Sequence, residues 1–158
     1  MGFSNLGGVT IIVVIDASSL EEVLIRINEE FLKINKVAMG KPILIREYHR
    51  RINDMKGRGE EYGRVLSPLK DFMHSIELWV DDEVEHNFDC IVEIPRKDLH
   101  LFVTAKEAAL RDGAEEAIVI SSDGGVIEVK ECENGRARVR VIPVEEFQGA
   151  FRNESLPP

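Results

Sequence analysis

Unbroken runs of apolar, β-branched residues along the chain predict the buried strands of a sheet. Val9 to Ile15 is apolar apart from one threonine, and Ala117 to Ile120 has the same character much later in the chain. This composition is typical of strands that are covered on both faces. We predict further strands at three other apolar stretches, which are Pro42 to Tyr48, Ile76 to Val80 and Phe88 to Ile94.

Apolar residues spaced three or four apart predict three amphipathic helices. These helices cover Leu20 to Lys36, Glu60 to Ser75 and Leu99 to Arg111. Ser18 and Glu21 have the spacing of a capping box at the start of the first helix. Pro68 must lie near the start of the second helix or bend it. The third has Asp98 placed as its N-cap and Gly113 as its stop.

This alternation of strands and helices predicts an α/β fold, with a mainly parallel central sheet flanked by helices. The alternative is an α+β fold built from two duplicated ferredoxin-like βαβ units. The segment Val126 to Glu133 stays open: it either pairs with Arg136 to Val144 as a hairpin across Asn134-Gly135, or it forms a short helix. We expect a single domain at 9–147, an N-terminal arm at 1–8 and a flexible C-terminal tail at 148–158.

The composition is that of an ordinary globular protein. The chain has 158 residues, of which 44% are hydrophobic and 31% charged, and this balance excludes a disordered or fibrous chain. Its two cysteines, Cys90 and Cys132, are too few for a disulfide-rich secreted scaffold, so we expect reduced thiols and a cytoplasmic location. Its apolar runs are too short for a membrane helix, and we expect no membrane association.

One segment departs from the acidic character of the chain. The net charge is −9, yet residues 41–70 carry eight basic side chains against four acidic ones. A basic segment in an acidic protein can hold an anion locally, which makes RNA a candidate partner; the alternative is a solvated helix and loop. The residues we predict to contact RNA are Arg46, Arg50, Arg51, Lys56, Arg58 and Arg64.

Acidic residues follow the predicted strands directly. Asp16 ends the first strand, Glu47 lies at the end of the second, and Asp123 follows Ala117 to Ile120. Asp98 opens a helix near the same edge if the sheet is parallel. Because ligands of open α/β sheets bind beyond the carboxyl ends of the strands, we expect these acids to converge on Mg²⁺ or Mn²⁺. Such a cluster can orient a water and offset the charge that develops in phosphodiester cleavage.

Each of these acids also has a purely local interpretation. Asp16 is equally well placed to cap a helix or a turn, and Asp98 to act as an ordinary N-cap. Asp123 lies in a Ser-Asp-Gly-Gly sequence, which is typical of turns. Glu47 has basic neighbours in sequence and is equally compatible with a surface ion pair.

Three patches of the chain carry a family resemblance, and they are Val13-Val14-Ile15-Asp16-Ala17-Ser18, Asp98 to Asp123 and Val139 to Phe147. In that order they resemble the opening strand, the later acidic half of the NYN branch and the closing strand of the PIN-domain and NYN-domain (PIN-like) nucleases. The resemblance implies a PIN-like fold and a metal-dependent endoribonuclease or RNA-binding domain. It also implies that Asp16, Asp98 and Asp123 are the catalytic, metal-holding carboxylates, with Glu47 as a candidate fourth ligand.

The chain departs from the NYN pattern at three positions. Ser19 stands where these proteins usually have Asn, and Thr104 and Gly125 stand where they usually have acids. The departures predict weakened catalysis. The rival function is a non-catalytic α+β interaction module of unknown ligand, for which a homodimer is one assembly to consider. An enzyme that uses the basic loop Lys56 to Arg64 on small phosphorylated metabolites is a third.

Overall fold

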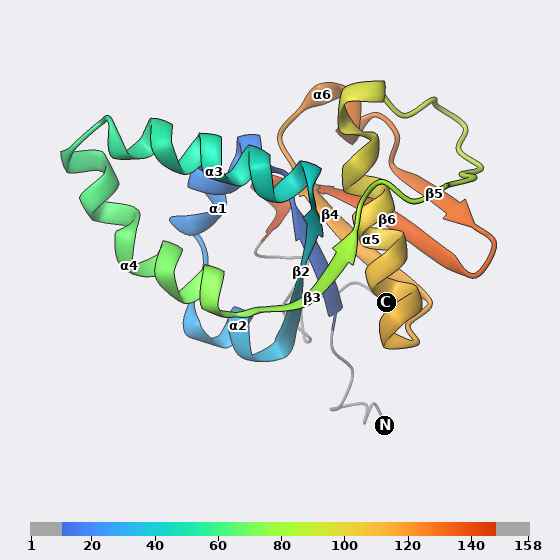
Figure 1. Cartoon of the computed structure of the whole chain (residues 1–158), viewed down its shortest axis with the longest axis horizontal. Helices are drawn as coiled ribbons and strands as arrows, with labels where there is room; N and C mark the ends of the chain where they lie inside the picture. Colours follow the sequence, from blue (N-terminus) through green and yellow to red (C-terminus); the bar gives the residue numbers. More distant parts are fainter. Residues whose placement is uncertain (1–10, 148–158) are drawn as a thin grey trace.

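A computed structural model describes residues 11–147 of the chain (Figure 1). The expected arm at 1–8, the tail at 148–158 and the first two residues of the strand predicted from Val9 lie outside this range. The strands are β1 (Ile11–Ile15), β2 (Asn35–Lys41), β3 (Ile76–Asp81), β4 (Glu116–Ser121), β5 (Glu131–Asn134) and β6 (Ala137–Pro143). The helices are α1 (Leu20–Leu24), α2 (Glu29–Ile34), α3 (Ile43–Lys56), α4 (Glu60–His74), α5 (Leu99–Asp112) and α6 (Gly124–Ile127). Short 3₁₀ helices occur at η1 (Ala17–Ser19), η2 (Arg96–Asp98) and η3 (Val144–Glu146).

The strands form one six-stranded sheet in the order β3-β2-β1-β4-β6-β5. All neighbours pair in parallel except β5, which runs antiparallel to β6. This arrangement confirms the predicted α/β class and its mainly parallel sheet. The ferredoxin-like alternative is wrong, because it requires a sheet of antiparallel strands. The carboxyl ends of the five parallel strands therefore meet at one edge.

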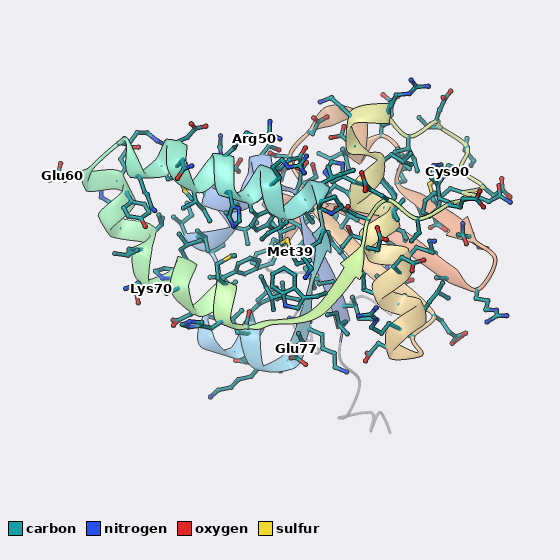
Figure 2. The ribbon with its side chains drawn as sticks, in the orientation of Figure 1. Met39, Arg50, Glu60, Lys70, Glu77 and Cys90 are labelled. Carbon is teal, nitrogen blue, oxygen red and sulfur yellow. A yellow bond between two sulfur atoms is a disulfide. The ribbon has the colours of Figure 1, made fainter. Side chains whose placement is uncertain are left out.

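Helix α5 packs along the sheet and contacts β1, β2, β3, β4 and β6, while α3 packs against β2 (Figure 1). The pair α3 and α4 extends away from the sheet on the β2 side. The core lies between these layers: Val13, Val14 and Ile15 of β1 are fully buried, and Met39 lies in the same interior (Figure 2). A buried central strand of this kind is what the unbroken apolar run predicts.

Two predicted elements in the first half of the chain are wrong. The helix expected over Leu20 to Lys36 is two short helices, α1 and α2, followed by β2. The strand expected at Pro42 to Tyr48 is the first part of α3. The physical reason is that Leu44 and Tyr48, four residues apart, are both fully buried on one helix face.

The segment predicted as a strand at Phe88 to Ile94 forms no strand. Its side chains still alternate between partly buried and exposed, and Ile91 points fully into solvent. Only Asp89 pairs with the sheet, through an isolated bridge to Glu133. The alternation of a strand is therefore present, but the ladder of hydrogen bonds that would make it one is missing.

The other predicted elements are close to the observed ones. Helices α4 and α5 and strands β3 and β4 lie where the pattern places them, with Pro68 inside α4. Gly113 ends α5 in the left-handed conformation, with φ of 70°. The segment Val126 to Glu133, for which two alternatives were considered, contains both. The short α6 precedes β5, and β5 pairs with β6 across Asn134-Gly135. Gly135 has φ of 56° there, as tight hairpin turns require.

The two cysteines form a disulfide, Cys90–Cys132, which joins the segment after β3 to β5 (Figure 2). The expectation of reduced thiols is therefore wrong in this structure. Proximity explains the bond: the bridge between Asp89 and Glu133 brings the two backbones together, and the Cα atoms lie 4.6 Å apart. In residues 11–147, no helix combines the length and apolar character needed to cross a membrane.

Candidate functional site

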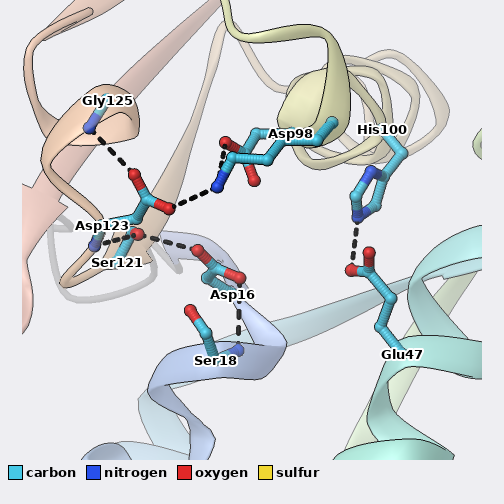
Figure 3. A network of polar contacts seen from close by, with 9 residues as sticks. Asp16, Ser18, Glu47, Asp98, His100, Ser121, Asp123 and Gly125 are labelled. Carbon is cyan, nitrogen blue, oxygen red and sulfur yellow. Dashed lines mark hydrogen bonds and ion pairs between the residues drawn. The ribbon is translucent and has the colours of Figure 1, made fainter.

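A pocket of about 380 Å³ lies at the edge where the parallel strands end. All four acids predicted from the sequence line it. Its lining residues are Asp16, Ala17, Ser18, Glu47, Arg50, Arg51, Asp54, Lys97, Asp98 and Asp123. Figure 3 shows that Asp16, Asp98 and Asp123 turn toward one another, while Glu47 turns to one side. The predicted convergence of these residues is thus present in the structure.

Asp16 is placed by the end of β1 and is only 5% exposed. Its Oδ1 accepts a hydrogen bond from the backbone N–H of Ser18 at 3.3 Å. Its Oδ2 accepts one from the hydroxyl of Ser121, the last residue of β4, at 2.8 Å. The local capping role is therefore real, but it uses one oxygen, and the other links the ends of two neighbouring strands.

Asp123 follows β4 and divides its two oxygens in a similar way. Oδ1 accepts a hydrogen bond from the Gly125 backbone N–H at 2.9 Å and so caps α6. Oδ2 accepts one from Nζ of Lys97 at 3.0 Å. The hydrogen bond from Lys97, together with those from backbone N–H groups, lowers the pKa of Asp123 below its usual value. The turn interpretation is thus correct for one oxygen only.

Asp98 is the least satisfied of the acids. It precedes α5 in the N-cap position, but its side chain makes no capping hydrogen bond. The residue is 7% exposed, and its buried Oδ2 has no hydrogen-bond partner. The nearest cation is Nζ of Lys97, at 3.7 Å. Burial raises the pKa of Asp98, and the negative charges of Asp123 and Asp16 add to the effect although Lys97 opposes it.

Glu47, on α3, does not pair with the basic residues beside it in sequence. Its Oε1 lies 2.7 Å from Nε2 of His100, which is 5% exposed on α5 (Figure 3). The hydroxyl of Thr104 donates to the backbone carbonyl of His100 one turn earlier in the helix. The surface ion pair considered for Glu47 is therefore replaced by a contact between α3 and α5 at the pocket wall.

Two of the six predicted RNA-contacting residues, Arg50 and Arg51, line the acidic pocket. Arg51 also donates to the backbone carbonyl of Ser18 at 3.3 Å, whereas Arg50 is exposed on α3 (Figure 2). Arg58 lies beyond α3 and is engaged elsewhere, with Glu21 at 2.6 Å and Glu61 at 3.3 Å. The remaining three are exposed but do not line the pocket: Arg46, Lys56 and Arg64.

The pocket has the donor atoms of a hard-cation site but not a finished coordination shell. Carboxylate oxygens are the ligands that Mg²⁺ and Mn²⁺ prefer, and Oδ2 of Asp98 is a buried oxygen without a partner. Across residues 11–147, however, no group of three or more histidine, cysteine, aspartate or glutamate side chains is arranged to hold a metal ion. The cation that does contact these carboxylates is the ammonium group of Lys97.

Sequence reasoning did not identify the partners of the acids. Lys97 had one available signal, its position next to Asp98, but nothing in the sequence pairs it with Asp123, 26 residues away. His100 and Glu47 are 53 residues apart, and Ser121 and Asp16 are 105 apart. These contacts depend on how α3, α5 and the strand ends meet, which no local pattern encodes.

The geometry of the pocket is the basis for any functional argument, since comparison with known proteins adds no relative. Compared with models of known protein families, with curated proteins and with solved structures, the chain matches none.

Proposed function

We propose that this chain is a PIN-like domain that binds RNA and acts as a Mg²⁺- or Mn²⁺-dependent phosphodiesterase at the acidic pocket, with weakened catalysis. The observation that carries the proposal is the convergence of Asp16, Glu47, Asp98 and Asp123, from four separate segments, on one pocket at the carboxyl ends of parallel strands. Ligands of open α/β sheets bind at this edge.

The mixed charge of the pocket favours a phosphodiester over a neutral ligand. Arg50 and Arg51 lie on the α3 wall, beside the carboxylates, and guanidinium groups are well suited to bind phosphate oxygens. Acidic and basic side chains at one pocket can hold a cation and the phosphate that it neutralises. A phosphorylated small molecule would use the same groups, so RNA is preferred here because α3 carries two further exposed basic side chains outside the pocket, Arg46 and Lys56.

Asp16, Asp98 and Asp123 are the residues that would hold the metal, and Oδ2 of Asp98 is a buried oxygen that accepts no hydrogen bond and has only the more distant Lys97 ammonium group near it. A divalent cation bound there supplies charge neutralisation and an activated water. The protein groups contribute position: Ser121 fixes Asp16 and Gly125 fixes Asp123 through the hydrogen bonds given above. Arg50 would bind and orient the RNA phosphate.

Metal binding is the first test. Mn²⁺ or Mg²⁺ should raise the melting temperature, because a ligand that binds only the folded state stabilises it by about 2.7 kcal/mol at 100 times its dissociation constant. Asp123→Asn should reduce this shift, while Asp71→Asn, an exposed change on α4, should not. Absence of a shift at millimolar metal, or an equal shift in Asp123→Asn, would contradict the metal site.

RNA cleavage is the second test. A labelled single-stranded RNA should be cleaved slowly in Mn²⁺ and not in EDTA. Asp98→Asn should lower the rate about a hundredfold or more, as expected when a group that stabilises transition-state charge is lost, and Asp71→Asn should leave it unchanged. Metal-dependent RNA binding without cleavage would identify a binding domain instead. Absence of both binding and cleavage would overturn the proposal.

A further inference from the structure

We propose that Lys97 is an internal counter-ion that competes with the divalent cation for Asp98 and Asp123, so that the site binds metal strongly only when Lys97 leaves. This inference rests on the proposed function and concerns the regulation of the same pocket. Its starting point is a conflict within the structure: four carboxylates line one pocket, yet no three are arranged to hold a metal ion in residues 11–147.

The position of Lys97 accounts for this conflict. Its Nζ lies 3.0 Å from Oδ2 of Asp123 and 3.7 Å from Oδ2 of Asp98, so one ammonium group contacts both carboxylates. Carboxylates this close repel each other unless a positive charge lies between them. A monovalent ammonium group meets that need, and it occupies the place that a metal bound by the same two oxygens would take.

The contact of Lys97 with the two carboxylates can break without a change in the backbone. The Lys97 side chain is 72% exposed, and its ammonium group makes no ion pair in the described structure except those with Asp98 and Asp123. Its removal needs only rotation about a flexible side chain into solvent. By contrast, Asp98 has a 10% exposed side chain and cannot follow it. Departure of Lys97 would therefore leave two buried or part-buried oxygens without a cation.

An RNA phosphate is the group that would draw Lys97 outward. Lys97, Arg50 and Arg51 all line the pocket, and a phosphate bound there would attract the ammonium group of Lys97 in place of the carboxylates. Metal and RNA would then bind with positive coupling, because each favours the same displaced position of Lys97. By linkage, the factor by which RNA improves metal affinity equals the factor by which metal improves RNA affinity.

The experiment compares Mn²⁺ affinity among variants of the full chain by titration calorimetry. Lys97→Met should bind Mn²⁺ roughly five- to tenfold more tightly than the natural protein, a coupling at the low end of the usual range because the side chain is exposed. Lys97→Arg keeps the positive charge, so its Mn²⁺ affinity should stay as weak as that of the natural protein. Arg96→Met removes a neighbouring charge that faces a different pocket, and it should leave the affinity unchanged.

A second measurement adds a non-cleavable 2′-O-methyl RNA oligonucleotide. The RNA should improve Mn²⁺ affinity of the natural protein but not that of Lys97→Met, in which no ammonium group has to leave. Equal Mn²⁺ affinity in Lys97→Met and the natural protein would overturn the counter-ion role while the metal site stands. Tighter Mn²⁺ binding by Lys97→Met, with no change in Lys97→Arg and Arg96→Met, would support the counter-ion role. Failure of every variant to bind Mn²⁺ would overturn both this inference and the proposed metal-dependent function.

Discussion

At the scale of single residues, the surroundings of Asp98 and Asp123 shift the pKa values of these two acids in opposite directions. The pKa of Asp98 is raised, mainly by burial, and that of Asp123 is lowered, mainly by the hydrogen bond from Lys97. Such opposed shifts are typical of functional sites, where one group is destabilised in its charged form and its neighbour is stabilised. They also make the stability of the protein depend on pH in two distinguishable ways.

Replacing each acid by its amide should reveal these opposite pKa shifts as opposite changes in stability. Because the folded state raises the pKa of Asp98, its carboxylate costs stability at neutral pH, and the cost disappears as the pH falls through the raised pKa. Asp98→Asn should therefore melt higher than the natural protein at pH 7, with a difference that shrinks on acidification. Asp123→Asn should melt lower at pH 7, because the stability given by a lowered pKa is present above the ordinary value of 3.8 and is lost as the pH falls through the lowered one. Melting temperatures between pH 3 and 8 test both, and the same sign for both variants would contradict this account.

Among the glycines of the described residues, Gly40 in β2 has the least room for a side chain. A β-carbon there would lie 2.5 Å from Oδ2 of Asp82 and still closer to Oγ1 of Thr104. Gly40→Ala should cost about 1–3 kcal/mol of unfolding free energy, as overpacking of a core does. The matched control is Gly63→Ala in α4, where a β-carbon meets nothing within 4 Å; it should add up to about 1 kcal/mol through helix propensity. Urea unfolding measures both, and similar values for the two variants would contradict the close packing at Gly40.

At the scale of elements, α3 illustrates how a distant residue sets secondary structure. Pro42 precedes the helix and offers no side-chain cap. The first N–H groups instead donate to Asp82, which follows β3: Ile43 to Oδ1 at 3.1 Å and Leu44 to Oδ2 at 2.8 Å. Helix α3 therefore begins where the Asp82 carboxylate, just after β3, accepts hydrogen bonds from its first N–H groups, although the local sequence favours a strand.

Removal of the hydrogen bonds between Asp82 and the start of α3 should destabilise the protein. Asp82 is 2% exposed, so Asp82→Ala leaves the part-buried N–H of Ile43 and the buried N–H of Leu44 without their partner, and we expect a loss of about 2 kcal/mol. Asp81→Ala is the matched control, because the Asp81 side chain is exposed and, within residues 11–147, accepts a hydrogen bond only from the N–H of Glu83. Its effect should stay within about 0.5 kcal/mol. Equal losses in urea unfolding would show that α3 does not depend on Asp82.

At the scale of the whole molecule, an acidic chain of net charge −9 can attract RNA only through local positive charge. Arginine residues project from α3 beside the pocket, whereas Arg58, at the far end, is bound by Glu21 and Glu61. We therefore expect few phosphate contacts and a shallow dependence of RNA affinity on salt, because each contact with a single strand contributes a slope of about −0.7.

The salt dependence should separate the two kinds of arginine. Arg50→Ala should weaken RNA binding and reduce the slope of log affinity against log salt by roughly 0.7, as expected for one lost phosphate contact. Arg58→Ala should leave the slope unchanged, because its guanidinium group already binds two carboxylates. Fluorescence anisotropy between 50 and 200 mM salt measures both slopes. An equal reduction in the two variants would extend the RNA contact past the C-terminal end of α3 instead.

The sequence predicted the elements whose stability is local or whose burial is complete. The apolar runs of β1 and β4 need both faces covered, which a parallel sheet provides. Helix α5 ends at Gly113, and the hairpin turns at Asn134-Gly135, because these residues accept the backbone conformations required there. The placement of Asp16 and Asp123 after β1 and β4 was also predictable, since parallel strands present their carboxyl ends at one edge. Glu47 reaches the pocket from α3 and not, as predicted, from the end of a strand.

Only the tertiary structure decided where β2 and α3 lie and what contacts the acids. Strand β2 carries Ala38 and Gly40 because α5 packs closely against it, and such small residues give little strand signal. The contacts of Lys97 with Asp123 and of His100 with Glu47 join residues far apart in the chain, as does the disulfide between Cys90 and Cys132. Local propensity acts over a few neighbouring residues, whereas these positions are fixed by packing between distant segments, and this is why the pattern along the chain did not contain them.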